Sequence, residues 1–120
     1  MKRLSVPVGQ PIEPSDIDSL LADDPAIEVV FVTHNETSTA VTNRMPEIAA
    51  VVKGRGKLLA VDSVSGAGCI PLDTDPLGVD VAVTGSQTGW MAPPGLTMLA
   101  VSAAPSAKAA RAPTPPRYLA

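Results

Sequence analysis

Three clusters of polar side chains each follow an apolar stretch that has the pattern of a buried strand. The clusters are residues 34–39, 62–65 and 84–88. The carboxyl ends of parallel strands meet at one edge of a sheet, and ligands of such sheets bind in the crevice beyond that edge. We therefore expect the three clusters to face one crevice.

Asp62 is the first candidate, because it ends the apolar stretch 58–62. A carboxylate at that point borders the low-dielectric interior and needs a partner, and a cationic heterocycle would be a suitable one. The ordinary alternative is a solvated aspartate or a cap on the following turn, and spacing alone favours that alternative.

The other two clusters also allow two interpretations. The hydroxyl groups of residues 37–39 could hold an anion or a ring substituent, but these residue types are also common in plain turns. The loop 85–90 has a glycine near each end and could approach a ligand closely, or it could simply lead to the next strand. Its tryptophan, Trp90, is more typical of a packing residue than of a stacking platform.

Other catalytic patterns are absent from the sequence or weak. Ser86 does not stand in a G-x-S-x-G motif, and residues 54–57 do not form a Walker A loop. One histidine and one cysteine make a structural zinc site implausible. Cys69 has no basic neighbour in sequence and is expected to be a buried or inert thiol. An enzyme of another class using His34, Asp62 and Ser86 is the weakest hypothesis.

The length, charge and apolar runs of the chain exclude some classes of function. A chain of 120 residues allows one small domain, and its net charge of −3 offers no basic surface for nucleic acid. We find neither an apolar run long enough for a bilayer nor a signal-peptide core, so a soluble, cytoplasmic protein is expected.

Strand-like and helix-like stretches alternate along residues 1–102. Strands are predicted at 2–8, 28–33, 58–62, 79–84 and 96–101; helices are predicted at 16–23, capped by Ser15, from Pro46 to about Gly54, and at 103–112. The alternation indicates an α/β fold, with a mainly parallel sheet and flanking helices. The remaining tail is rich in proline and alanine.

Read together, the clusters resemble those of the class-V aminotransferases, which use pyridoxal phosphate. The similar groups are the alanine–glyoxylate and serine–glyoxylate aminotransferases, including proteins called soluble hydrogenase small subunit. The matching stretches are FVTHNETST (31–39), LAVDSVS (59–65), VDVAVTGSQ (79–87), PPGL (93–96) and PRY (116–118). The resemblance implies that residues 1–102 are a central part of the large domain of a type I pyridoxal-phosphate enzyme, with residues 103–120 as a short helix and tail.

The resemblance also implies roles for individual residues. Asp62 would pair with the pyridine nitrogen of the cofactor, which makes the ring an electron sink. Val64 would pack against one face of the ring. Thr37 and Gln87 match positions that contact the cofactor, so all four are expected to bind it.

Three residues depart from the family pattern. Thr88 stands where the family has the lysine that forms the Schiff base and shuttles the proton, so covalent attachment of the cofactor is not expected. Ala40 replaces a usual glycine, and Gly66 replaces a frequent serine. No catalytic residue is therefore assigned.

The family enzymes are several times longer than this chain. This difference in length and the three departures lead to two hypotheses. The first is a fragment of an enzyme that transfers an amino group from a small amino acid to a 2-oxo acid, inactive alone and marginally stable. The second is a non-catalytic module that pairs with a full-length paralogue, or with itself, as subunits of this family form dimers.

Overall fold

The computed structural model describes residues 1–111. Its elements follow the chain in this order: α1 (Pro14–Asp23), β1 (Val29–Thr33), β2 (Asn35–Glu36), β3 (Val41–Thr42), α2 (Met45–Gly54), β4 (Leu58–Asp62), α3 (Thr74–Leu77), β5 (Val81–Gly85), β6 (Thr97–Val101) and α4 (Ala103–Ala110). None of the helices described is long and apolar enough to cross a membrane.

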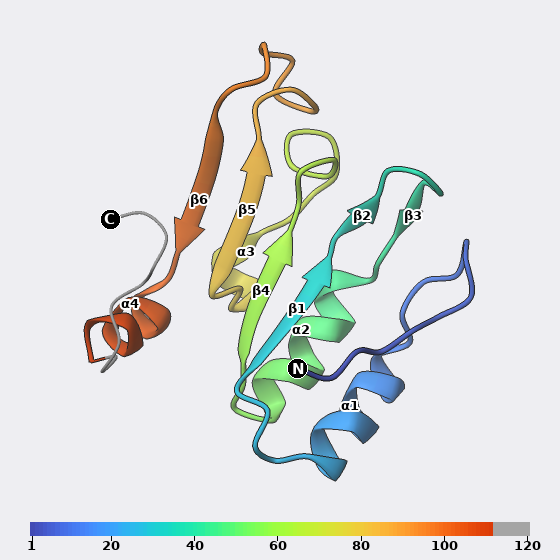
Figure 1. Ribbon diagram of the computed structural model, residues 1–120, viewed down its shortest axis with the longest axis vertical. Coiled ribbons are helices and arrows are strands. Elements are labelled where there is room, and N and C mark those ends of the chain that lie inside the picture. Colours follow the sequence, from blue (N-terminus) through green and yellow to red (C-terminus); the bar gives the residue numbers. More distant parts are fainter. Residues whose placement is uncertain (112–120) are drawn as a thin grey trace.

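A four-stranded sheet forms the centre of the molecule (Figure 1). Its strand order is β1-β4-β5-β6, in which β1, β4 and β5 are parallel and β6 is antiparallel to β5. The strands β2 and β3 form a separate small hairpin after β1. The α/β fold with a mainly parallel sheet is thus confirmed.

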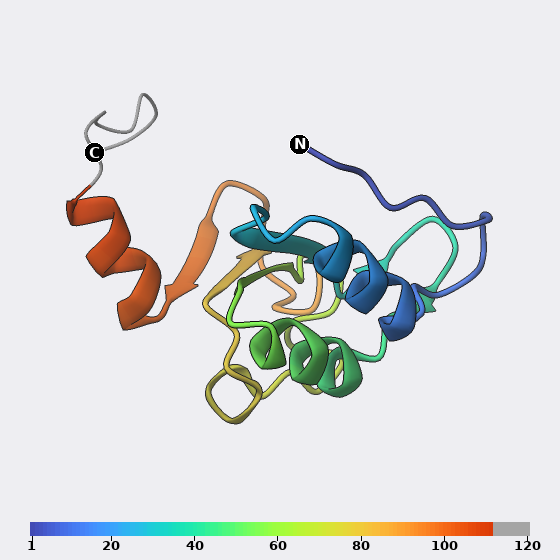
Figure 2. The ribbon, with the colours of Figure 1, turned by 90° about the horizontal axis from the view of Figure 1, so that it is seen from below.

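One face of the sheet is covered by helices, and α1 and α2 lie together on that side (Figure 2). The core there consists of apolar side chains from both helices and from the strands beneath them: Ile17, Leu21, Ile48, Val52, Val32, Leu59 and Val61. The alternate residues of the strands point to the opposite face. On β1 and β6 these residues remain exposed, including Phe31 at 65% and Leu99 at 59%.

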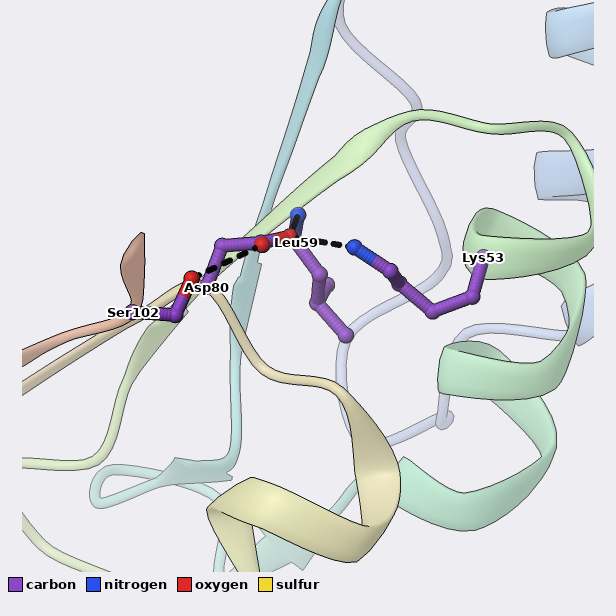
Figure 3. Close-up of polar contacts among 4 residues, drawn as sticks. All are labelled: Lys53, Leu59, Asp80 and Ser102. Carbon is purple, nitrogen blue, oxygen red and sulfur yellow. Dashed lines mark hydrogen bonds and ion pairs between the residues drawn. The ribbon is translucent and has the colours of Figure 1, made fainter. Parts of the chain in front are cut away.

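Asp80 joins three elements at the edge where the parallel strands begin. Its buried carboxylate accepts hydrogen bonds from the Lys53 ammonium at 2.6 Å, the Leu59 backbone N–H at 2.8 Å and the Ser102 hydroxyl at 3.1 Å (Figure 3). Burial raises the pKa of Asp80, but these hydrogen bonds and the ammonium charge outweigh burial and leave the pKa below its ordinary value.

Two local predictions from the sequence are wrong. Residues 2–8 form no strand, and Leu4 packs against the core instead. The segment ends in a turn, in which the Pro7 carbonyl accepts a hydrogen bond from the Gln10 N–H. Ser15 does not cap α1, because the helix already begins at Pro14, whose fixed φ suits the first turn. The hairpin β2–β3 and the single turn α3 were not anticipated.

Candidate functional site

The three polar clusters lie at one edge of the sheet, because β1, β4 and β5 are parallel. The sequence also predicts that they face one crevice, but the cavity beside this edge is lined by Ser63 and Thr84 and by no residue of the cluster 34–39. Strands β1, β4 and β5 run in the same direction, so the segments that follow them emerge at the same end of the molecule (Figure 1). This edge is opposite the one that holds the Asp80 network.

Asp62 lies half-buried at the end of β4. Its Oδ1 accepts a hydrogen bond from the Val64 N–H at 3.0 Å, and its carbonyl accepts one from the His34 N–H at 2.7 Å. The carboxylate thus caps the following turn with one oxygen. The other oxygen, Oδ2, has no hydrogen-bond partner among the described residues.

Thr88 reaches the same turn from the loop after β5. Its hydroxyl donates a hydrogen bond to the Val64 carbonyl. Gly89 allows this approach, because a Cβ at Gly89 would stand only 2.2 Å from the carbonyl oxygen of Ala67. The structure thus brings Thr88 to the turn that holds Asp62 and Val64, although Thr88 lies 24 residues after Val64 in the sequence.

Two further contacts fasten the turn that carries Asp62 and Val64. The His34 Nδ1 and the Ser63 Oγ lie 2.9 Å apart, and both side chains are 2% exposed. The Ser65 hydroxyl donates to the Asn35 carbonyl at 2.7 Å. Sequence reasoning did not single out Ser63, Ser65 or Asn35, because their partners belong to another strand.

Thr37 and Gln87 are both exposed, and the structure does not join them to Asp62. Thr37 lies in the turn between β2 and β3. The Gln87 amide folds back over Gly85, where an added Cβ would meet its Oε1 at 2.6 Å. Their role toward a cofactor stays a prediction.

The combination of His34, Asp62 and Ser86 finds no support as a catalytic set. The partner of His34 is Ser63, while the Ser86 hydroxyl donates to the Pro93 carbonyl at 2.7 Å and accepts from the Leu96 N–H at 3.3 Å. Ser86 is therefore buried, and its hydroxyl is engaged within its own loop.

Two titratable groups at this edge have shifted pKa values. Burial lowers the pKa of His34, so its imidazole is held neutral. Hydrogen bonds from the backbone and the hydroxyl of Ser38 lower the pKa of Glu36, so this carboxylate remains charged. The edge therefore offers negative charge and hydrogen-bond acceptors.

A cavity of about 420 Å³ lies beside this site, between strands β5 and β6 and residues 67–74. Its lining is mostly apolar and includes none of Thr37, Asp62, Val64 or Gln87. Trp90 borders this cavity, is 49% exposed and donates from its indole to the Thr84 hydroxyl at 3.2 Å. Cys69, expected to be buried or inert, is exposed.

Comparison with known proteins adds to this geometry. Residues 2–114 match the model of the family "Aminotransferase class-V". A soluble hydrogenase small subunit from a Synechococcus species is 42% identical over 105 residues, which are 84% of this chain and 27% of that protein.

Two solved structures are similar to the fold. Pyridoxamine-pyruvate aminotransferase from Mesorhizobium loti superposes with a TM-score of 0.88 at 36% identity, over 95% of this chain and 29% of that one. Alanine–glyoxylate aminotransferase from a Nostoc species superposes with a TM-score of 0.86 at 28% identity, over 92% of this chain and 29% of that one. The chain spans somewhat more than a quarter of the length of each.

Proposed function

The chain belongs to the class-V aminotransferase family, and we propose that it binds a pyridoxal-phosphate cofactor reversibly but does not transfer amino groups by itself. The observation that carries this proposal is the Oδ2 of Asp62, which has no hydrogen-bond partner among the described residues and lies at the end of β4, beside the contact between Val64 and Thr88. The proposal fits a family whose members use this cofactor.

The donor set of the site fits the ring of the cofactor. The carboxylate of Asp62 is fixed by the Val64 N–H and would accept a hydrogen bond from a protonated pyridine nitrogen. The half-buried Val64 would exclude water from one face of the ring. Thr37 and Gln87 would contact other parts of the cofactor from the neighbouring loops.

The same site lacks the group that would perform the proton transfers. When bound, the cofactor supplies an electron sink for the substrate. A side-chain amine must then hold and return the proton, and Thr88 has none. Asp62 can keep the ring nitrogen protonated, but no described side chain in the site replaces the amine.

The substrates and the domain assignment are also part of the proposal. The relative from Mesorhizobium loti is named for pyridoxamine and pyruvate, and other relatives are named as transaminases of pyruvate. This supports a small amino compound and a 2-oxo acid as the ancestral substrates. We assign residues 1–102 to part of the family's large domain and residues 103–120 to a short helix and tail; residues 112–120 lie outside the described residues.

Titration of the 120-residue chain with pyridoxal phosphate tests the proposal. We expect saturable quenching of the Trp90 emission, weakened about tenfold or more in Asp62→Asn, because a charge-assisted hydrogen bond is lost. The matched control is Asp23→Asn, which removes the same charge at the end of α1. Absence of saturable binding of both pyridoxal phosphate and its amine form would refute cofactor binding.

A second measurement tests the inactivity. Purified chain is incubated with the cofactor, alanine and glyoxylate, and the formation of pyruvate is followed. We expect no more pyruvate than the cofactor forms alone. Turnover above that background would show that another group replaces the lysine.

The exposed apolar face of the sheet favours a second candidate function, assembly with another polypeptide. Parallel sheets are normally covered on both faces, whereas Val29, Phe31, Leu99 and Val101 are all at least 46% exposed here. Mixing the chain with a full-length relative and measuring mass by light scattering tests this candidate. A persistent monomer would count against it.

A further inference from the structure

We infer that the site beside Thr88 takes the amine form of the vitamer, pyridoxamine or its phosphate, in preference to the aldehyde form. The inference rests on the proposed function, because it concerns the same site, and it goes further by naming the chemical form of the ligand. Both forms carry the same ring, so the preference must come from the group at the carbon that reacts in the family enzymes.

The hydrogen bond of Thr88 decides which group that carbon can carry. A hydroxyl has one hydrogen to donate and two lone pairs to accept. The hydrogen of Thr88 Oγ1 is used on the Val64 carbonyl, so the hydroxyl offers only acceptor capacity to a ligand. An aminomethyl group is a donor and can bond to it, whereas an aldehyde oxygen is another acceptor and cannot.

The lysines with described side chains are not available to the aldehyde in this site. Lys53 is paired with Asp80, Lys2 with Asp24, and the Lys57 ammonium donates to the Pro25 carbonyl. All three contacts lie at the edge where the parallel strands begin, opposite Asp62 (Figure 3 shows the first). The aldehyde form therefore gains no covalent bond from these lysines.

The charge at this edge favours a cationic ligand group. Glu36 follows β1 and Asp62 ends β4, so two carboxylates lie at the end of the sheet where Thr88 lies. Hydrogen bonds from Ser38 hold Glu36 in its charged form. The ammonium of pyridoxamine gains from this negative potential, and an uncharged aldehyde does not.

Four ligands and two variants test the inference. Pyridoxamine, pyridoxal and their two phosphates are each titrated into the chain, and dissociation constants are taken from the Trp90 emission. We expect each amine to bind about tenfold more tightly than the matching aldehyde, as an added hydrogen bond to a charged donor implies. Including both phosphorylation states separates the amine preference from any contribution of the phosphate.

The variants assign the preference to the hydroxyl of Thr88. Thr88→Val removes it at nearly constant shape, and we expect the ratio of the two constants to fall toward one; Thr88→Ser keeps the hydroxyl and should keep the ratio. Reaction of aldehydes with surface lysines is the same in all variants and cancels in this comparison. Far-UV circular dichroism confirms that each variant is folded.

Two results would overturn the inference. Aldehydes that bind as tightly as amines, with binding still dependent on Asp62, would refute it and leave the proposed function standing. An unchanged ratio in folded Thr88→Val would refute the role of the hydroxyl. If neither form binds, the proposed function fails together with the inference.

Discussion

The imidazole of His34 and the hydroxyl of Ser63 form a buried pair that joins the ends of β1 and β4. Their Nδ1 and Oγ atoms lie 2.9 Å apart, and a Cβ added at Gly66 would stand 2.4 Å from the same Nδ1. The glycine therefore leaves the space in which the ring sits. Since Ser63 lies between Asp62 and Val64, the pair holds the turn that forms the candidate site.

Replacement of His34 tests this relationship. His34→Leu fills the space but leaves the Ser63 hydroxyl without its partner, which costs about 1–3 kcal/mol for a buried polar group. His34→Asn places an amide near the position of Nδ1 and should lose less. Unfolding in urea measures both variants, and equal losses would show that Ser63 needs only packing.

Stability should also depend on the protonation of His34. Burial lowers the pKa of this residue from 6.5, so the unfolded chain binds the proton more readily than the folded chain. Stability is therefore complete above about pH 6.5 and falls as the pH drops below it, by at most about 1.4 kcal/mol per unit.

His34 is the only histidine of the chain, so no other imidazole contributes to the dependence of stability on pH. The free energy of unfolding is measured from about pH 5 to pH 8. His34→Asn should lose most of the dependence near pH 6. The same slope in this variant would assign the dependence to another group.

Asp80 should contribute more to stability than an exposed carboxylate with a similar partner. Asp80→Asn leaves Lys53 without its counter-ion and weakens the bond to Leu59, at a cost of about 1–3 kcal/mol. Asp18→Asn is the matched control, because Asp18 pairs with Arg55 at 2.7 Å on the surface and should lose much less.

The stability of Asp80→Asn should also depend on pH differently from that of the parent chain. The pKa of Asp80 in the folded chain is below 3.8, so its contribution is complete above that pH and is lost as the pH falls through the lowered value. Asp80→Asn lacks this part of the acid sensitivity. Identical acid unfolding of variant and parent would contradict the assignment.

Ala40 is held in a left-handed backbone conformation, with φ 55°. This conformation is unfavourable for a residue with a Cβ and free of strain for glycine. Ala40→Gly should therefore raise the free energy of unfolding by about 0.5–1 kcal/mol. Ala50→Gly, at an exposed position inside α2, should lower it by about 1 kcal/mol. Destabilisation by both would show that Ala40 is not strained.

Much of the sheet could be predicted from the sequence, because each strand carries its own signal. The stretch 58–62 is a continuous apolar run that ends in a charge, and it forms β4 with the same bounds. The hairpin β2–β3 has no such signal. Its two-residue strands are held by a contact between the side chains of Asn35 and Thr42 at 2.8 Å, which no local pattern contains.

The site could be predicted only in part for a similar reason. Asp62 ends β4 and Thr88 follows β5, so their place at the edge of the sheet follows from topology. The bond between Thr88 and the Val64 carbonyl depends on how closely two loops approach, and this is set by Gly89 and its distance to Ala67. The pairing of His34 with Ser63 likewise requires the register of β1 against β4.

Thr88→Lys restores an amine at the position where the family has its lysine, and it should restore attachment of the cofactor. The aldehyde of pyridoxal phosphate can then form a carbon–nitrogen double bond with Lys at this position, and borohydride reduces that bond to a stable amine. Peptide mapping by mass spectrometry, at one equivalent of cofactor, should find the adduct on residue 88. The parent chain should carry none on residue 88, because threonine has no amine.

We expect Thr88→Lys to restore covalent attachment of the cofactor but not amino-group transfer. The lysine side chain is longer and does not keep the hydrogen bond that the Thr88 hydroxyl donates to the Val64 carbonyl. The turn beside Asp62 therefore loses one of the contacts that hold it. Asp62→Asn added to Thr88→Lys should lower the yield of adduct, because the ring is then held less firmly. An adduct spread over the surface lysines and independent of Asp62 would show that the edge of the sheet does not bind the ring, whatever residue stands at position 88.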